Sequence, residues 1–420
     1  MKKYKYLQLI LIVLISGLIG YYIGVSRVSY EWKNFRPKVT VINREPPASL
    51  STVDFSLFWT VWQKLEDSYY DKTALDGQKF VNGAISGMVG SIGDPYTVFL
   101  PPVQNTDFKQ TMAGQFHGIG AELGMKDKQI IVVAPLDGSP AEKAGVKGGD
   151  IIFKVDGKSI EGWNINQAVE KIKGPKGTPV VISVLHKDDN KLTDIKIVRD
   201  VITVKSVVMW VKKVKDIDKI DLKKYADQEV AYFRLSQFGD NTNQEWLGLA
   251  NKLALKLNED KKVKGMILDL RNNPGGYLTD ATFIAAEFIK EGNTVVIQDK
   301  GNGERTEFTA SRKGLLLDIP LVILINKGSA SASEIVAGAM RDYKRAKLIG
   351  DVSFGKGTIQ TAEDLGNKGA GLHVTIAKWI TPKETWVHGK GLTPDITVAL
   401  DPKDPTRDTQ LEKAVEELVK

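Results

Sequence analysis

The hydrophobic pattern of this 420-residue chain begins with an uncharged run over residues 6–26, which directly follows a lysine-rich start. As a helix this run would span roughly 30 Å, the thickness of a bilayer core. The pattern predicts an uncleaved membrane anchor within residues 1–30. A cleaved signal peptide is the alternative, but its apolar region is typically shorter, and no small-residue cleavage motif follows the run.

A helical pattern follows a proline-containing segment over residues 31–50, which we interpret as a linker. Aromatic and aliphatic residues recur at steps of three and four over residues 55–65, so they share one face of a helix. A second helix is expected over residues 77–89, and both belong to a helical region over residues 51–110. The aromatic face predicts core packing or a contact between subunits, and therefore a homo-oligomer such as a dimer.

Short strand-like runs separated by turns replace the helical pattern over residues 111–200. Ser139 and Pro140 predict the start of a short helix, because serine is favoured at the N-cap and proline at the first helical position. An amphipathic helix and a closing hairpin complete this module. The segment Gly118-Ile119-Gly120 opens it, and on its own this glycine pattern is typical of a plain turn.

Buried strands alternate with helices over residues 201–400, which is the pattern of an α/β core. Apolar runs at residues 266–270 and 321–325 have the length of buried strands. The first run ends in a Pro-Gly-Gly turn ahead of a helix. The remaining residues, 401–420, predict a C-terminal segment with a short helix from Asp408 to Lys420.

Candidate chemistry lies directly after residues 321–325, where three serines alternate with alanines: Ser329, Ser331 and Ser333. Such serines are typical of helix capping. A serine between a buried strand and a helix N-terminus also faces free backbone N–H groups, which suit an oxyanion. Lys356 lies between two glycines, and a buried neutral lysine can act as a general base for a serine. Gln360, four residues later, would orient the amine.

Residues 326–338 and 351–360 resemble the signature of the carboxy-terminal processing peptidases, also called tail-specific proteases. In that family a serine and a lysine twenty-five residues later form the catalytic dyad, and a glutamine follows four residues beyond the lysine. Counting back from Lys356 therefore makes Ser331 the nucleophile, Lys356 the base and Gln360 the residue that orients it. The resemblance extends over about residues 50–400.

The module over residues 111–200 resembles a PDZ domain in the circular arrangement of bacterial envelope proteases, because its turn, helix and strand elements occur in that order. A PDZ domain binds a peptide by strand addition and receives the terminal carboxylate on backbone N–H groups. We expect Gly118, Ile119 and Gly120 to form this carboxylate loop. The expected partners are proteins or peptides with free C-termini.

The resemblance also implies an oxyanion hole and a fold. Residues 268–276 match the family motif Leu-Asp-Leu-Arg-Asn-Asn-Pro-Gly-Gly, so Gly276 and Ala332 are the expected donors of two oxyanion-binding amides. The expected fold class is multidomain, with α/β and α+β parts. It comprises a crotonase/ClpP-like α/β protease core, an inserted PDZ domain and an N-terminal helical region.

Composition and charge argue against several other classes of protein. The chain has no cysteine, which excludes thiol catalysis, disulfides and cysteine-based zinc sites. The net charge of +7 is modest for this length and charges of both signs interleave, so nucleic-acid binding is not indicated. The 4 histidines lie apart without metal-ligand spacing, so we expect neither a metal nor another cofactor.

Two alternatives come from other functional classes. Residues 350–356 resemble the start of a phosphate-binding loop, but Gly357 stands where serine or threonine would hold magnesium, and a strand rather than a helix follows. A non-catalytic PDZ scaffold at the membrane would need a broken dyad, whereas all three expected catalytic residues are present.

We therefore expect a membrane-anchored serine endopeptidase that recognises the C-terminal tail of its substrates through the PDZ domain. Long domains translocate largely regardless of nearby charge, and the family resemblance also places the catalytic part outside the cytoplasm.

Overall fold

The chain divides into two compact units, residues 1–80 and 81–420. The computed structural model describes residues 11–21, 28–33, 36–41, 53–126, 129–136, 138–186, 191–259, 262–366, 369–401, 404 and 407–420. The expected anchor over residues 6–26 therefore lies partly outside the described residues, and its described part, residues 11–21, is helical. Among the helices in these ranges, none combines the length and the apolar character needed to cross a membrane.

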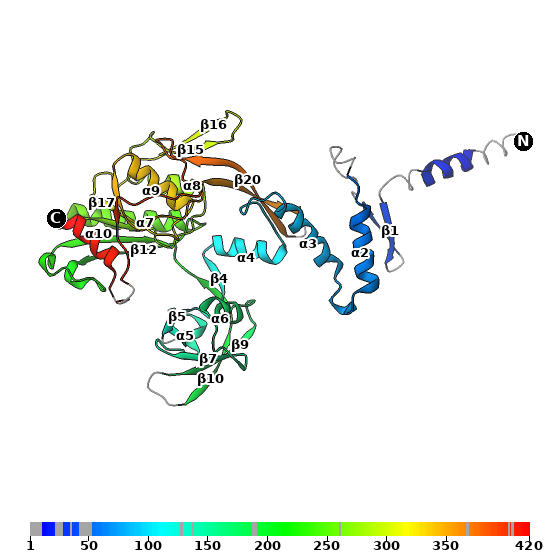
Figure 1. Ribbon diagram of the computed structural model, residues 1–420, viewed down its shortest axis with the longest axis horizontal. Helices are drawn as coiled ribbons and strands as arrows, with labels where there is room; N and C mark the ends of the chain where they lie inside the picture. Colours follow the sequence, from blue (N-terminus) through cyan, green and yellow to red (C-terminus); the bar gives the residue numbers. More distant parts are fainter. Residues whose placement is uncertain are drawn as a thin grey trace, which may run out of the picture. The chain divides into compact units, whose positions relative to one another are not determined.

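The first unit contains a hairpin and an aromatic helix (Figure 1). Strands β1 (Val28–Lys33) and β2 (Arg36–Val41) pair antiparallel, so part of the segment expected as a linker is a hairpin. Helix α2 (Ser56–Ser68) has no buried residue, and Trp59 is 61% exposed. Within one chain, the aromatic face of α2 is therefore an open surface rather than core.

The second unit begins within helix α3 (Gly77–Gly90), which is followed by strand β3 (Val98–Leu100) and helix α4 (Pro102–Met112). β3 pairs antiparallel with the long strand β20 (Ala370–Ile380). This pairing attaches the turn before β3, residues 94–97, to a strand about 275 residues later in the sequence, since Val98 pairs with His373.

A β-rich module follows α4. The module begins with β4 (Gln115–Gly118) and ends with β11 (Asp200–Thr203), and these two strands pair antiparallel. Inside it, the strands run in the order β10-β9-β7-β6-β5, and β8 pairs with β7. Their bounds are β5 (Ala121–Lys126), β6 (Gln129–Pro135), β7 (Ile151–Val155), β8 (Lys158–Ser159), β9 (Pro179–Leu185) and β10 (Leu192–Val198).

Two helices pack in this module, α5 (Pro140–Lys143) and α6 (Ile165–Ile172). The expected helix start at Ser139 is confirmed, because its Oγ accepts a hydrogen bond of 3.2 Å from the Glu142 N–H. β5 ends the sheet order, and within the described residues no strand pairs with its outer side.

A six-stranded sheet forms the core of the part of the chain that follows this module, in the order β12-β13-β14-β17-β18-β21. β12 runs antiparallel to β13, and the remaining pairs are parallel. Their bounds are β12 (Val207–Lys213), β13 (Glu229–Leu235), β14 (Val263–Asp269), β17 (Leu321–Ile325), β18 (Ala346–Gly350) and β21 (Ile396–Thr397). Short 3₁₀ helices occur at Lys72–Ala74, Val214–Asp216 and Lys223–Tyr225.

Helices cover both faces of this sheet, which explains why its strands read as continuous apolar runs. Phe233 and Ile323 lie in the core that includes residues of α7, α8 and α9, whereas Tyr232 and Leu324 pack in a separate cluster with α10. Neighbouring residues of a strand point to opposite faces, so α10 covers the face opposite to the other three helices. The helices are α7 (Thr242–Glu259), α8 (Leu278–Ala285), α9 (Ala332–Asp342) and α10 (Thr409–Val419).

A second sheet lies beside this core and runs in the order β16-β15-β20-β19, with β3 paired to β20. Its strands, besides β3 and β20, are β15 (Thr294–Asp299), β16 (Arg305–Thr309) and β19 (Thr358–Leu365). The fold is thus the expected α/β core with an inserted module. The two sheets bring the end of β17 and the start of β19 into one region.

Candidate active site

The three serines after β17 have different environments. Ser329 Oγ donates a hydrogen bond of 2.8 Å to the Leu270 carbonyl, and Ser333 Oγ donates one of 2.9 Å to the Asn273 carbonyl. Both serines are fully buried, whereas Ser331 is partly exposed. Ser329 and Ser333 therefore anchor the turn, and Ser331 is the one of the three that is accessible from solvent.

The backbone at Ser331 is strained. Ser331 is the N-cap of α9 and has φ 53° and ψ −114°, a combination that is rare for a residue with a side chain. Such conformations persist where the surrounding structure enforces them and are frequent at functional sites. Because the helix starts at Ala332, the first free N–H groups of α9 lie directly beside the serine.

A glycine loop approaches Ser331 closely. A methyl group on Gly275 would lie 2.8 Å from Ser331 Cβ and 2.9 Å from the Ala332 nitrogen, so a larger residue does not fit. Gly276 has φ 143°, and a methyl group there would overlap the Phe238 carbonyl. Within the described residues, neither the Gly276 amide nor the Ala332 amide donates a hydrogen bond. Both N–H groups could therefore donate to an oxyanion, as expected. Their role as oxyanion donors stays a prediction.

Glu334, which was not among the residues expected from the sequence, holds this site together. The Glu334 carboxylate is fully buried on the first turn of α9. One oxygen accepts hydrogen bonds of 2.9 Å from both the Ser331 N–H and the Lys356 N–H. The other accepts bonds of 2.6 Å from the Ser353 hydroxyl and 2.7 Å from the Gly355 N–H. A glutamate three residues after an N-cap serine is a capping-box pattern, and this signal was available in the sequence.

Lys356 lies in a partly buried position between two crowded glycines. Gly355 has φ 91°, and a methyl group on Gly357 would lie 2.7 Å from Trp386 Nε1. Lys356 Nζ lies 5.0 Å from the centroid of the Tyr96 ring. Burial lowers the pKa of Lys356, while the nearby Asp94 carboxylate opposes this shift. A lysine with a lowered pKa reaches its neutral form, which a general base requires, at lower pH.

Gln360 lies on β19, but its observed contacts differ from the expected one. Its Nε2 donates hydrogen bonds of 2.9 Å to Thr358 Oγ1 and 3.0 Å to Thr375 Oγ1. In the part of the chain that the structure describes, no hydrogen bond joins Lys356 Nζ to either Gln360 or Ser331 Oγ. The orienting role of Gln360 stays a prediction.

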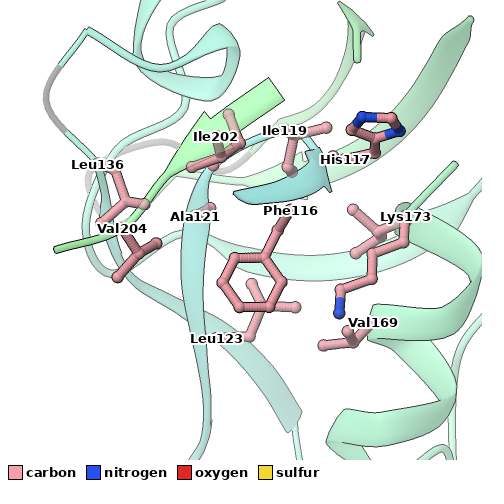
Figure 2. A pocket seen from close by; sticks show the side chains of 13 residues that line it. Phe116, His117, Ile119, Ala121, Leu123, Leu136, Val169, Lys173, Ile202 and Val204 are labelled. Atoms are coloured by element: carbon pink, nitrogen blue, oxygen red, sulfur yellow. The ribbon is translucent and has the colours of Figure 1, made fainter. Parts of the chain in front are cut away.

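The expected carboxylate loop borders a cavity in the β-rich module (Figure 2). The cavity has a volume of about 180 Å³ and an apolar lining that includes Ile119, Leu123, Val169 and Ile202. Figure 2 shows the Lys173 side chain beside Phe116 and Val169, and its Nζ lies 5.3 Å from the Phe116 ring centroid. The cavity offers an apolar pocket with one cation at its edge.

The loop itself is built for close approach. A methyl group on Gly120 would lie 2.6 Å from Ser139 Cβ, and Gly120 has φ 73°. The Ile119 carbonyl accepts a hydrogen bond from the Ala141 N–H, whereas no acceptor for the Ile119 or Gly120 N–H is found among the described residues. These two N–H groups are available for a carboxylate, and their role stays a prediction.

Comparison with known families matches three parts of the chain. Peptidase family S41 matches residues 229–398, a PDZ domain matches residues 131–185, and the activating protease CtpB N-terminal domain matches residues 14–102. A carboxy-terminal-processing protease of Bartonella bacilliformis is 39% identical over 341 residues, covering 81% of this chain and 74% of its own. The carboxy-terminal processing protease CtpA of Bacillus subtilis is 36% identical over 353 residues, covering 84% and 71%.

Solved structures give the same picture. The photosystem II D1 C-terminal processing protease has a TM-score of 0.51 at 29% identity, covering 87% of this chain and 97% of its own. A putative S41 protease from Bacteroides fragilis has a TM-score of 0.56 at 15% identity, covering 90% and 98%, and this likeness concerns the fold alone.

Glu334 generates the first testable prediction. Glu334→Gln keeps the volume of the side chain but replaces one acceptor oxygen with an NH₂ group, which faces two donors. We expect peptidase turnover to fall about 100-fold, because small displacements of reacting groups have effects of this size. The measurement is kcat/KM on a peptide substrate, together with a thermal melt to show that the variant is folded.

Glu363→Gln is the matched control, since it makes the same replacement of a carboxylate oxygen by an NH₂ group at an exposed position on β19. It should behave as the wild type. Turnover of a folded Glu334→Gln variant within threefold of wild type would contradict the positioning role of Glu334.

Proposed function

The chain belongs to the carboxy-terminal processing proteases of peptidase family S41, and we propose that Ser331 and Lys356 are the nucleophile and the general base with which this serine peptidase works. The observation that carries the assignment is the shared Glu334 carboxylate, because one of its oxygens holds the backbone N–H groups of both residues. The partial exposure of Ser331 and the lowered pKa of Lys356, which burial causes, support it.

In the proposed mechanism, the neutral amine of Lys356 removes the proton from Ser331 Oγ while the oxygen attacks the peptide carbonyl. The resulting ammonium then donates this proton to the departing amine, and the C–N bond breaks to leave an acyl group on Ser331. A water molecule, deprotonated by the same lysine, attacks the acyl carbon. The lysine ammonium then gives this proton to Ser331 Oγ as the bond between Oγ and the acyl carbon breaks, which releases the carboxylic acid and restores the serine.

The negative oxygen that forms in each addition step needs preorganised donors. The amides of Gly276 and Ala332 are proposed for this role, because Gly275 and Gly276 bring the loop against the start of α9. Donors of this kind typically contribute about 3–4 kcal/mol each to transition-state stabilisation.

We further propose that substrates are selected by their C-terminal tail in the cavity beside Gly118, Ile119 and Gly120. The outer side of β5 is available for an added strand, and backbone hydrogen bonds along it would supply affinity for many sequences. The apolar cavity would accept the last side chain. The free N–H groups of the loop would bind the terminal carboxylate.

The membrane anchor is a proposal supported by the uncharged run over residues 6–26, which follows lysines, and the catalytic part would then lie outside the cytoplasm. The corresponding test is fractionation of cells that express the full chain, followed by carbonate extraction. Release of the full-length protein into the soluble fraction by carbonate would contradict the proposal.

A homodimer is supported by the aromatic face of α2, where Trp59, Phe58 and Phe55 are exposed. Large exposed apolar patches on a soluble domain mark interaction surfaces. Sedimentation of wild type against Trp59→Glu tests this proposal, since a charge in an apolar interface should give monomers. An unchanged sedimentation coefficient would remove α2 from the interface.

The catalytic assignment predicts that Ser331→Ala abolishes peptidase activity. Removal of a serine nucleophile costs on the order of 10⁶ in turnover, whereas the loss of one partly exposed hydroxyl should leave the fold intact. Ser329→Ala is the control, because Ser329 is a buried turn anchor that should retain measurable turnover in its folded fraction. Activity in Ser331→Ala, with complete loss in Ser329→Ala, would show that the wrong serine was assigned.

Tail selection predicts that a peptide with a free C-terminus is cleaved roughly 10–100-fold more efficiently than its amidated form, the range expected for a charge-assisted hydrogen bond. Leu123→Glu, which places a negative charge in the cavity and repels the terminal carboxylate, should remove most of this difference. Val133→Glu, at an exposed position on the adjacent strand β6, is the matched control. Equal rates for free and amidated peptides with wild-type enzyme would exclude selection by the terminal carboxylate.

A further inference from the structure

The turn over residues 94–97 forms one wall of the region around Lys356. The Asp94 carboxylate organises this turn, because it accepts hydrogen bonds of 3.1 Å from the Tyr96 N–H and 2.7 Å from the Thr97 hydroxyl. The Thr375 N–H on β20 donates a bond of 3.1 Å to Thr97 Oγ1. The turn is therefore fixed to the sheet that also carries the segment after Lys356.

Lys356 Nζ lies over the face of Tyr96 in a geometry that suits its charged form. At 5.0 Å from the ring centroid, an ammonium is attracted by the ring quadrupole, whereas a neutral amine is not. The Asp94 carboxylate adds an attraction of the same kind, because it opposes the lowering of the Lys356 pKa. Within the described structure, Lys356 Nζ lies against Tyr96 and makes no hydrogen bond to Ser331 Oγ.

We propose that Tyr96 and Asp94 form a resting site for the protonated Lys356 side chain, which the lysine leaves as a neutral amine to take the proton of Ser331. Tyr96 is then a positioning residue for the peptidase reaction. The inference rests on the proposed function of Lys356 as the general base. It adds a defined location, beside Tyr96 and Asp94, for the protonated form of Lys356, which cannot act as a base. The roles of Ser331 and Lys356 in the reaction do not by themselves imply such a location.

The same strand links the resting site to Gln360. The Thr375 side chain accepts a hydrogen bond from Gln360 Nε2, while its backbone N–H donates to the Thr97 hydroxyl. Gln360 is therefore connected to the wall of the resting site rather than to the lysine itself. If the lysine moved towards Ser331, Gln360 Nε2 would keep its hydrogen bonds to Thr358 and Thr375. Gln360 Oε1, which accepts no hydrogen bond from the described residues, would remain available as an acceptor.

Other titratable groups face this region, and they define its pH dependence. Glu334 accepts the Lys356 backbone N–H, and His388 contacts the Tyr96 ring edge-on with centroids 6.2 Å apart. Burial lowers the pKa of His373 on β20, and the charge of Lys356 lowers it further, so His373 stays neutral near neutral pH. Burial raises the pKa of Tyr96, with Glu334 and Asp94 adding to the shift, so its hydroxyl stays protonated. The lysine is thus the group near Tyr96 whose charge changes at alkaline pH.

The test is the pH dependence of kcat/KM for wild type, Tyr96→Leu and Tyr96→Phe. Leucine fills similar space without a π face, so the charged lysine loses an attraction and the midpoint of the alkaline rise should move down by about 0.5–1 pH unit. Below the wild-type midpoint, this shift corresponds to a roughly 3–10-fold higher rate relative to the plateau of the same variant. Phenylalanine keeps the aromatic face and should keep the wild-type midpoint.

A second readout removes substrate binding from the comparison. The rate at which a fluorophosphonate labels Ser331 should show the same midpoints, and Asp94→Asn, which removes a carboxylate, should also move the midpoint down. A merely structural role for Tyr96 would lower the rate at every pH without moving the midpoint. That outcome, or an equal shift in Tyr96→Phe, would overturn the resting site.

Lys356→Arg separates failure of this inference from failure of the proposed function. A guanidinium stays protonated, so this variant should neither cleave peptide nor be labelled. An active Lys356→Arg variant would show that Lys356 is not the base, and both proposals would fall. An inactive Lys356→Arg variant, with an unshifted midpoint in Tyr96→Leu, would remove the resting site alone.

Discussion

A fully buried carboxylate determines how the two halves of the proposed active site face each other. Glu334 has no cationic partner among the described residues, and its charge is stabilised by four donors from two segments of the chain. A buried polar group that loses its partner costs about 1–3 kcal/mol, so the start of α9 and the Ser353–Lys356 loop resist separation. Glu334 therefore holds together the backbone segments that carry the proposed nucleophile and the proposed base.

The parallel sheet supplies the second constraint. β14 and β17 are adjacent and parallel, so their carboxyl ends meet at one edge, where the Ala330 N–H donates a hydrogen bond of 3.0 Å to the Asn273 carbonyl. The loop after β14 must then pass within contact distance of Ser331, which only glycine permits at position 275. The same geometry brings the loop of Gly275 and Gly276 beside the start of α9, where the proposed oxyanion donors lie.

Local features of the fold could be predicted from the sequence, and long-range features could not. β17 has the expected bounds, Ser139 caps its helix, and α10 starts directly after Asp408, because each depends on neighbouring residues. The contact of Tyr96 with Lys356 depends on the pairing of β3 with β20, which no local pattern encodes. Gln360 shows the same limit. Its position on a strand after Lys356 was expected from the sequence, but its hydrogen bond to Thr375 depends on the pairing of β19 with β20.

The open side of β5 has a consequence for which proteins this module could recognise. A segment that extends a sheet must offer unpaired backbone N–H and C=O groups, which residues in a helix or in the interior of a sheet do not have. The proposed recognition at β5 would therefore depend on whether the end of a protein is folded as well as on its last side chains. A protein that loses its native structure or its partner subunit would expose such an end and become a ligand without any change in sequence.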